Sequence, residues 1–132
     1  MTPEQKQKIL KVCKKFHFDF AVLFGSSSQK SQFARDHDIA FYSRKKTASE
    51  LSLKLSSDLY PFFTKPVDII ILTSTTDPLL SYEIAHKGEL ICELKKESFL
   101  QFQTMSWKKY IDTKRYREYE KEYIRKKVKN VA

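Results

Sequence analysis

The sequence contains few glycines, few cysteines and no long apolar run, and these shortages exclude several classes of protein. Two cysteines, Cys13 and Cys92, are too few for a disulfide framework and lack metal-type spacing, so we expect packed, reduced thiols. No window reaches the ~18 consecutive apolar residues of a membrane span, and residues 1–6 carry no apolar signal core. We therefore expect a cytoplasmic protein that neither spans a membrane nor is secreted.

Positive charge is concentrated near the C-terminal end of the chain. The formal net charge is +9; residues 95–132 hold 12 Lys/Arg against 5 Asp/Glu, whereas residues 1–94 hold 13 against 11. A basic segment favours an anionic partner, such as a nucleotide, a nucleic acid or an acidic protein face. The length of 132 residues fits one domain. We divide it into a core over residues 1–95 and a basic C-terminal helix over residues 96–132 that packs on the core or on a partner.

Apolar periodicity and turn residues predict alternating helices and strands. The order indicates an α/β (α+β) fold with a mixed β-sheet flanked by helices, and a C-terminal helical extension. Residues 67–72 are almost continuously apolar and β-branched, so we expect this strand to be central in the sheet. The expected helices are 2–16, 47–60, 79–86 and 97–127, and the expected strands are 18–24, 39–42 (begun by 36–38), 67–72 and 90–92.

Glycine is so rare here that each one needs a local reason. The chain has two, whereas an average usage of ~7% would give about nine. Gly88 can end the preceding helix as its cap. Gly25 follows a strand and precedes Ser26, where a tight turn lets backbone amides and the Ser26 hydroxyl approach a phosphate. Taken alone, Gly-Ser after a strand is more often a simple turn than a phosphate site.

Asp36 and Asp38 stand two residues apart at the beginning of a predicted strand. Residues at this spacing share one face of a strand, so both carboxylates project together while His37 points away. Because like charges repel, a divalent cation is the natural partner of such a pair, and Mg²⁺ prefers one or two carboxylates with waters and substrate phosphate. An exposed acidic turn is the alternative interpretation of the same two residues.

Asp68 interrupts the most apolar strand of the chain. A carboxylate in a central strand costs several kcal/mol when it is buried and unpaired, but it is tolerated near a strand end that opens into a metal site. If strands 39–42 and 67–72 are neighbours, the three carboxylates converge. That arrangement suits two-metal phosphoryl transfer, with Asp68 also able to accept the proton of the incoming hydroxyl.

These segments together resemble a known family. Gly25-Ser26, nine intervening residues, the Asp36-x-Asp38 pair and a later strand acid at Asp68 resemble the signature of the DNA-polymerase-β-like nucleotidyltransferase superfamily. The stretches 22–26, 36–40 and 67–70 resemble more narrowly the minimal nucleotidyltransferase (MNT) domains, which include the antitoxins of HEPN–MNT toxin–antitoxin pairs. The likeness covers residues 18–93 well and the last helix loosely.

The resemblance implies an activity, a cofactor and a partner. In that family the Gly-Ser turn contacts the triphosphate of ATP, and the three acids Asp36, Asp38 and Asp68 bind Mg²⁺. MNT antitoxins transfer AMP from ATP to a tyrosine of their HEPN toxin, a ribonuclease. Where relatives often carry arginine after the Gly-Ser turn, this chain is rich in serine, and Lys30 can substitute for it as a point charge.

Three other functions fit parts of the sequence. The Ser-rich loop fits an MNT module that neutralises its partner by contact alone. A small-molecule nucleotidyltransferase, such as one acting on an aminoglycoside, fits the same fold, although the chain is short for it. Tyr116, Tyr119 and Tyr123 form a stripe among Lys and Arg, which indicates packing against the core or a partner helix, or a basic aromatic face for nucleic acid. A homo- or hetero-oligomer fits all of these readings.

Overall fold

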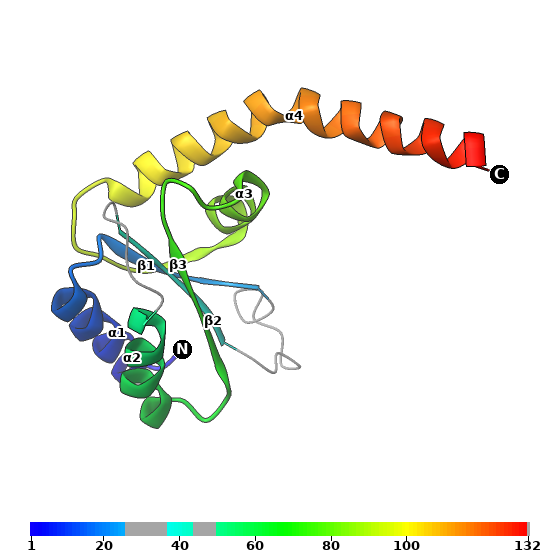
Figure 1. Ribbon diagram of the computed structural model, residues 1–132. Coiled ribbons are helices and arrows are strands. Elements are labelled where there is room, and N and C mark those ends of the chain that lie inside the picture. Colours follow the sequence, from blue (N-terminus) through cyan, green and yellow to red (C-terminus); the bar gives the residue numbers. More distant parts are fainter. Residues whose placement is uncertain (26–36, 44–49, 132) are drawn as a thin grey trace.

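The computed structural model describes residues 1–25, 37–43 and 50–131 (Figure 1). Within these ranges the helices and strands follow the predicted order, and a 3₁₀ turn, η2, comes after the second helix. The helices are α1 (Pro3–Phe16), α2 (Glu50–Leu59), α3 (Pro78–Lys87) and α4 (Ser98–Val131), and η2 is Tyr60–Phe62. The strands are β1 (Phe20–Phe24), β2 (His37–Tyr42), β3 (Val67–Leu72) and β4 (Glu89–Glu93).

The four strands form one mixed sheet in the order β3-β2-β1-β4, which confirms the predicted α/β (α+β) fold class. β1 pairs antiparallel with β2 and with β4, whereas β2 and β3 run parallel. The prediction that residues 67–72 form a central strand was wrong, because β3 lies at one edge of this sheet. The predicted short edge strand near residue 91 is confirmed as β4.

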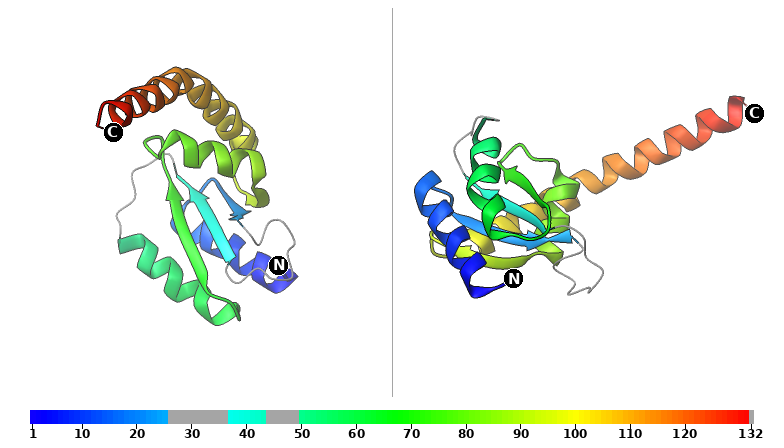
Figure 2. Two further views of the ribbon diagram at one scale, coloured as in Figure 1. Left: turned by 90° about the vertical axis from the view of Figure 1, so that its right-hand side faces the viewer. Right: turned by 90° about the horizontal axis from the view of Figure 1, so that it is seen from below.

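Helices cover both faces of the sheet, and this explains why β3 is apolar although it is an edge strand. α1 and α2 lie on one face and α3 and α4 on the other (Figure 2). Val67, Ile69 and Ile71 pack with the cluster under α1 and α2, while Ile70 and Leu72 pack with the cluster under α3 and α4. A continuously apolar strand therefore indicates that both faces of the strand are covered by helices, and it does not indicate that the strand has a neighbour on each edge.

Helix ends follow the side-chain chemistry of the sequence. The Thr2 hydroxyl accepts from the Gln5 amide at 3.2 Å, and the Gln5 side chain accepts from the Thr2 amide at 2.9 Å. Asp77 caps α3 by accepting from the Leu79 amide at 3.0 Å. Thr47, at which the second helix was predicted to begin, lies outside the described residues.

Gly88 ends α3, but its conformation differs from that of a left-handed cap. Its φ and ψ are −72° and 151°, which any residue can adopt, and its amide donates to the Ile84 carbonyl at 2.8 Å. A Cβ at this position would collide with Val22 of β1 and with the Ile84 carbonyl. Glycine is therefore required by the close approach of the helix end to the sheet.

The two cysteines lie against each other, and both are free. Cys13 of α1 is buried, and its sulfur is 3.5 Å from that of Cys92 in β4. The contact with Cys92 and burial raise the pKa of Cys13, whereas the hydrogen bond from Cys13 lowers the pKa of Cys92. The contact joins the first helix to the last strand, which the sequence did not predict.

α4 is much longer than the part of the core that it covers. It spans 34 residues, or about 51 Å at ~1.5 Å per residue, and it packs mainly against the 10-residue α3. Its C-terminal half projects away from the body (Figures 1 and 2). Among the helices of the described chain, α4 included, none has the length and apolar character needed to cross a membrane.

Candidate active site

Gly25, Asp38 and Asp68 meet at one end of the sheet. β1 ends just before Gly25, while β2 and β3 begin close to Asp38 and Asp68. Across β1 and β2, Phe24 is opposite Asp38; across β2 and β3, Asp38 is opposite Asp68. Neighbouring strands lie ~4.8 Å apart, and paired residues of a parallel ladder point to the same face. The register therefore places two carboxylates side by side.

The Asp38 carboxylate occupies the space that a side chain at position 25 would need. Its φ of 76° is in the left-handed region that favours glycine. A Cβ built at Gly25 would lie 3.1 Å from Asp38 Cγ and would overlap one of the carboxylate oxygens. The strand end and the acid therefore approach each other as closely as backbone and carboxylate can, and any other residue at position 25 would displace the acid.

His37 lies on the opposite face of β2, as the alternation of the strand requires. Its ring packs edge-on against Phe63 with 5.1 Å between ring centroids, and its amide donates to the Pro66 carbonyl at 2.9 Å. Burial, and then the positive charges of Lys65 and the N-terminal amine, lower the pKa of His37. The ring is a packing element on the side of α1 and α2, away from the carboxylates.

Asp68 is exposed, and this changes the argument that first singled it out. The sequence predicted a costly acid in a central strand, but β3 is an edge strand and water solvates the carboxylate, so the residue costs the fold little. What marks Asp68 is its register opposite the half-buried Asp38. Ser26, Lys30 and Asp36, the other predicted site residues, lie outside the described residues.

The described residues alone do not complete a metal site. Within residues 1–25, 37–43 and 50–131, no group of three or more His, Cys, Asp or Glu side chains could hold an ion. Asp38 and Asp68 supply two hard carboxylate ligands, which is the number that Mg²⁺ commonly takes from protein when substrate phosphate and water supply the rest. The donor chemistry therefore fits Mg²⁺, with Asp36 the predicted third ligand.

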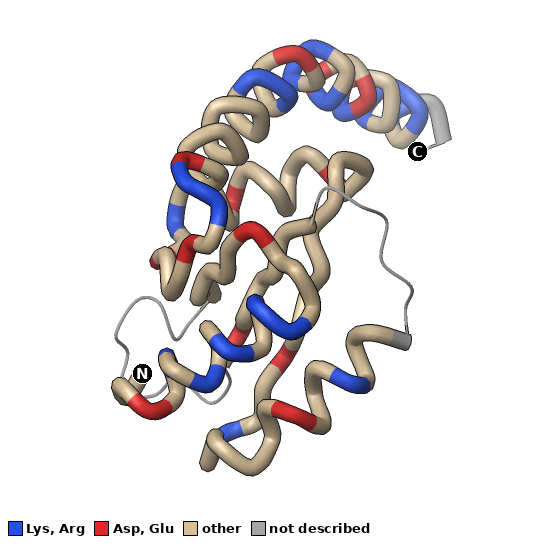
Figure 3. Tube along the Cα trace, turned by 90° about the vertical axis from the view of Figure 1, so that its left-hand side faces the viewer, with Lys and Arg blue, Asp and Glu red and all other residues tan. Residues whose placement is uncertain are grey.

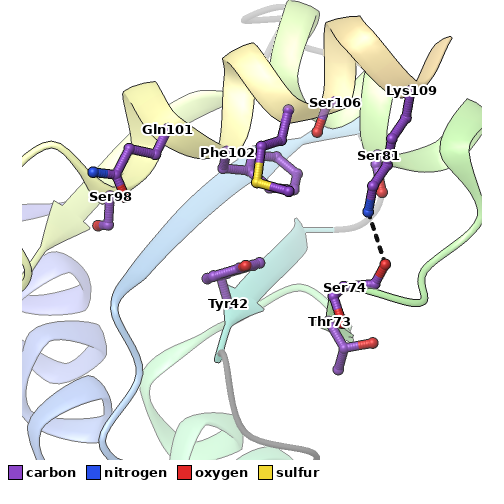
Figure 4. A pocket seen from close by; sticks show the side chains of 10 residues that line it. Tyr42, Thr73, Ser74, Ser81, Ser98, Gln101, Phe102, Ser106 and Lys109 are labelled. Carbon is purple, nitrogen blue, oxygen red and sulfur yellow. Dashed lines mark hydrogen bonds between the residues drawn. The ribbon is translucent and has the colours of Figure 1, made fainter. Parts of the chain in front are cut away.

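A pocket lies at the other end of the same strands (Figure 4). It lies between Tyr42 at the end of β2, Thr73 after β3, and the first turns of α4. Lys109 lines it, and its ammonium donates to the Ser74 carbonyl at 2.8 Å. Its volume of about 180 Å³ is below the ~300 Å³ of small ligand sites. No acid lines it, so we place the candidate active site at Asp38 and Asp68.

A stack of four side chains fixes α4 on α3, and sequence reasoning missed it. The Tyr82 ring stacks on His86 within α3 and on Tyr110 of α4, with 5.6 Å and 3.9 Å between ring centroids. The Arg117 guanidinium lies 4.3 Å from the Tyr110 ring centroid and donates to the Tyr110 carbonyl at 2.9 Å. Tyr82 and His86 are four residues apart and Tyr110 and Arg117 are seven apart, so each pair lies on one helix face, and this spacing could have predicted the stack.

The family follows from a match to its sequence profile. The profile of "Polymerase beta, Nucleotidyltransferase" matches residues 7–97, which is more than half of the chain. The chain belongs to this family, which places it in the nucleotidyltransferase class of enzymes. The match contains Gly25 and all three predicted acids. No curated protein matches the chain by sequence.

Solved structures with the same fold come from toxin–antitoxin complexes. A toxin–antitoxin structure with AMP-PNP matches with a TM-score of 0.78 and 20% identity, over 90% of this chain and 97% of the other. An MNT antitoxin complex with the tri-AMPylated HEPN toxin of Shewanella oneidensis matches with a TM-score of 0.75 and 18% identity, over 94% and 98%. The MntA–HepT complex matches with a TM-score of 0.75 and 16% identity, over 93% and 98%. At these identities the likeness is one of fold.

Proposed function

We propose that this chain is the antitoxin of a HEPN–MNT pair and transfers AMP from ATP to a tyrosine of its HEPN toxin. The observation that carries the proposal is the side-by-side placement of Asp38 and Asp68 beside Gly25, in a chain of the nucleotidyltransferase family. The likeness to structures that contain AMP-PNP and a tri-AMPylated toxin supports both the nucleotide and the acceptor.

The chemistry divides among few groups. Asp36, Asp38 and Asp68 would hold Mg²⁺, which when bound would neutralise the triphosphate and the charge that develops on it. The backbone after Gly25, with Ser26 and Lys30, would hold the phosphates. A phenol oxygen then forms a bond to the α-phosphorus, the bond from that phosphorus to the bridging oxygen breaks, and pyrophosphate leaves. Asp68, whose side chain is exposed, would accept the phenol proton.

The test is label transfer from ATP radiolabelled at the α-phosphate to the cognate HEPN toxin, which we expect a neighbouring gene to encode. We expect labelling that requires Mg²⁺ and falls at least about a hundredfold in Asp38→Asn and in Asp68→Asn. Asp77→Asn is the matched control, because the same charge is removed at the far end of the sheet while asparagine still caps α3. Absence of labelling by the wild-type chain, or equal labelling by the Asp38→Asn variant, would refute the proposal.

Neutralisation by contact alone is the second candidate. The observation that favours it is the exposure of Asp68 on an edge strand, where water solvates the carboxylate and the Asp68 charge needs no cation. In cells that express the toxin, this candidate predicts full protection by the Asp38→Asn/Asp68→Asn variant. Loss of protection in a variant that still binds the toxin would eliminate it and support transfer chemistry.

A further inference from the structure

The last 14 residues of α4 form a helical arm that leaves the body of the protein. We define the arm as residues 118–131, which follow Arg117, the last member of the stack that fixes α4 on α3. Every residue from 118 to 129 is exposed. Isolated helices of ~12–15 residues are marginal in water, so this arm receives little stability from what surrounds it.

One face of the arm continues the face with which α4 packs on the core. Within the packed half, Phe102, Ser106, Tyr110, Thr113 and Arg117 follow one another at spacings of three and four residues, and all are buried or half-buried.

The same spacing leads beyond the core to Ile124 and Val128, which are 53% and 63% exposed. We call these two residues the inner pair. They occupy positions that the first half of the same helix uses for packing.

The charge of the arm indicates the charge of a protein surface that would pack against it. The first five residues of the arm hold three glutamates and one lysine. Four of the five residues from 125 to 129, around Val128, are basic and none is acidic, and Figure 3 shows Lys and Arg near the end of α4. An apolar pair among these cations fits a surface that is apolar at its centre and acidic at its rim. A second copy would bring the same basic turns toward one another if its arm lay parallel.

The arm also points to the side of the molecule that carries the candidate active site. In Figure 1 and in the right-hand view of Figure 2, β1 runs toward the side on which the arm projects. Gly25 follows that end of β1, and Asp38 is opposite Phe24 there. A protein that packs on the inner pair would therefore lie on the same side as Asp38 and Asp68.

We infer that the arm is the docking element for the protein acceptor of the nucleotide, which covers the inner pair with an apolar surface bordered by carboxylates. This inference rests on the proposed function, because it takes the HEPN toxin as that acceptor. The arm raises the local concentration of the acceptor tyrosine at the site without contributing to the chemistry.

The experiment compares two variants of the full chain with matched composition. Ile124→Gln/Val128→Gln removes the inner pair, and Tyr116→Gln/Tyr119→Gln removes two exposed apolar side chains from a different face of the same helix. Binding of the cognate HEPN toxin is measured by calorimetry, and label transfer is measured at varied concentrations of toxin and of ATP. Helix content is checked by circular dichroism.

We expect the inner-pair variant to raise both the Kd and the KM for the toxin at least about tenfold, with kcat and the KM for ATP unchanged. The tyrosine variant should change neither by more than about twofold. Equal affinity of the inner-pair variant, or a larger loss in the tyrosine variant, would overturn the inference.

Two further outcomes identify a different occupant of the arm and also overturn the inference. One is a wild-type dimer in light scattering that the inner-pair substitutions dissociate. The other is RNA binding that depends on the inner pair. If the wild-type chain binds the toxin but transfers no label, the proposed function fails while the binding comparison still tests the arm.

Discussion

Replacing Gly25 with alanine should damage both the fold and the site, through one identifiable contact. The backbone there has a φ of 76°, and holding an L-residue in the left-handed region costs ~1–2 kcal/mol. The added methyl group also overlaps the Asp38 carboxylate, and forcing such overlap costs ~1–3 kcal/mol. We expect Gly25→Ala to lower the free energy of unfolding by about 2–5 kcal/mol.

The two contributions separate in a double-mutant cycle. In Asp38→Ala the carboxylate is gone, and the remaining Cβ lies 3.5 Å from the new methyl group, an ordinary contact. Gly25→Ala should then cost only the ~1–2 kcal/mol of the backbone conformation. The coupling free energy of ~1–3 kcal/mol is measured by urea unfolding of the wild type, both single variants and the double variant.

Gly88→Ala is the matched control for this cycle. Its backbone is unstrained, and its methyl group would strike Val22 and the Ile84 carbonyl. It should also destabilise the protein, but its cost should be independent of Asp38. A cost below ~0.5 kcal/mol for Gly25→Ala, or an equal cost in the presence and absence of the Asp38 carboxylate, would refute the reasoning.

Three further predictions concern the fold and the thiols. Phe20→Ala should cost ~3–5 kcal/mol in urea unfolding, because Phe20 is fully buried among Tyr42 and two α4 rings; a cost below 1 kcal/mol would contradict that packing. Thr2→Ala should cost ~1 kcal/mol through loss of the capping box, and retention of full stability would show that the cap is not formed. In the folded protein iodoacetamide should modify Cys92 before Cys13, as followed by mass spectrometry from pH ~6 to ~9.5, and the opposite order would contradict this prediction. Cys13→Ala should move the pH profile of Cys92 modification to higher pH, because it removes the hydrogen bond that lowers the pKa of Cys92.

The sequence predicted the elements well because local signals specify them. Apolar runs mark β1 and β2, Asp77 before Pro78 starts α3, and the absence of Pro and Gly after residue 97 allows one uninterrupted α4. Differences at the ends have local causes. β1 begins two residues later than predicted. The second helix ends at Leu59, where the chain passes into a 3₁₀ turn that contains Pro61.

What the sequence could not supply is how the elements are arranged. The apolar sequence of β3 indicates that helices cover both of its faces, but it does not predict how many strands pair with it. The Asp38–Asp68 register and the contact between Cys13 and Cys92 depend on pairings between distant segments. The close approach of Gly88 to Val22, which explains why this position is glycine, cannot be read from the helix that Gly88 ends.

The position of β4 beside β1 has a consequence for the order in which the chain can fold. β1 is complete at residue 24, but its second neighbour extends only over residues 89–93. Until that segment is available, one edge of β1, whose first four residues are buried in the native protein, has no partner strand. Such long-range pairing slows folding and leaves an edge that can pair with other chains. Synthesis must therefore pass residue 93 before β1 can pair on both of its edges, and α4 is made after that.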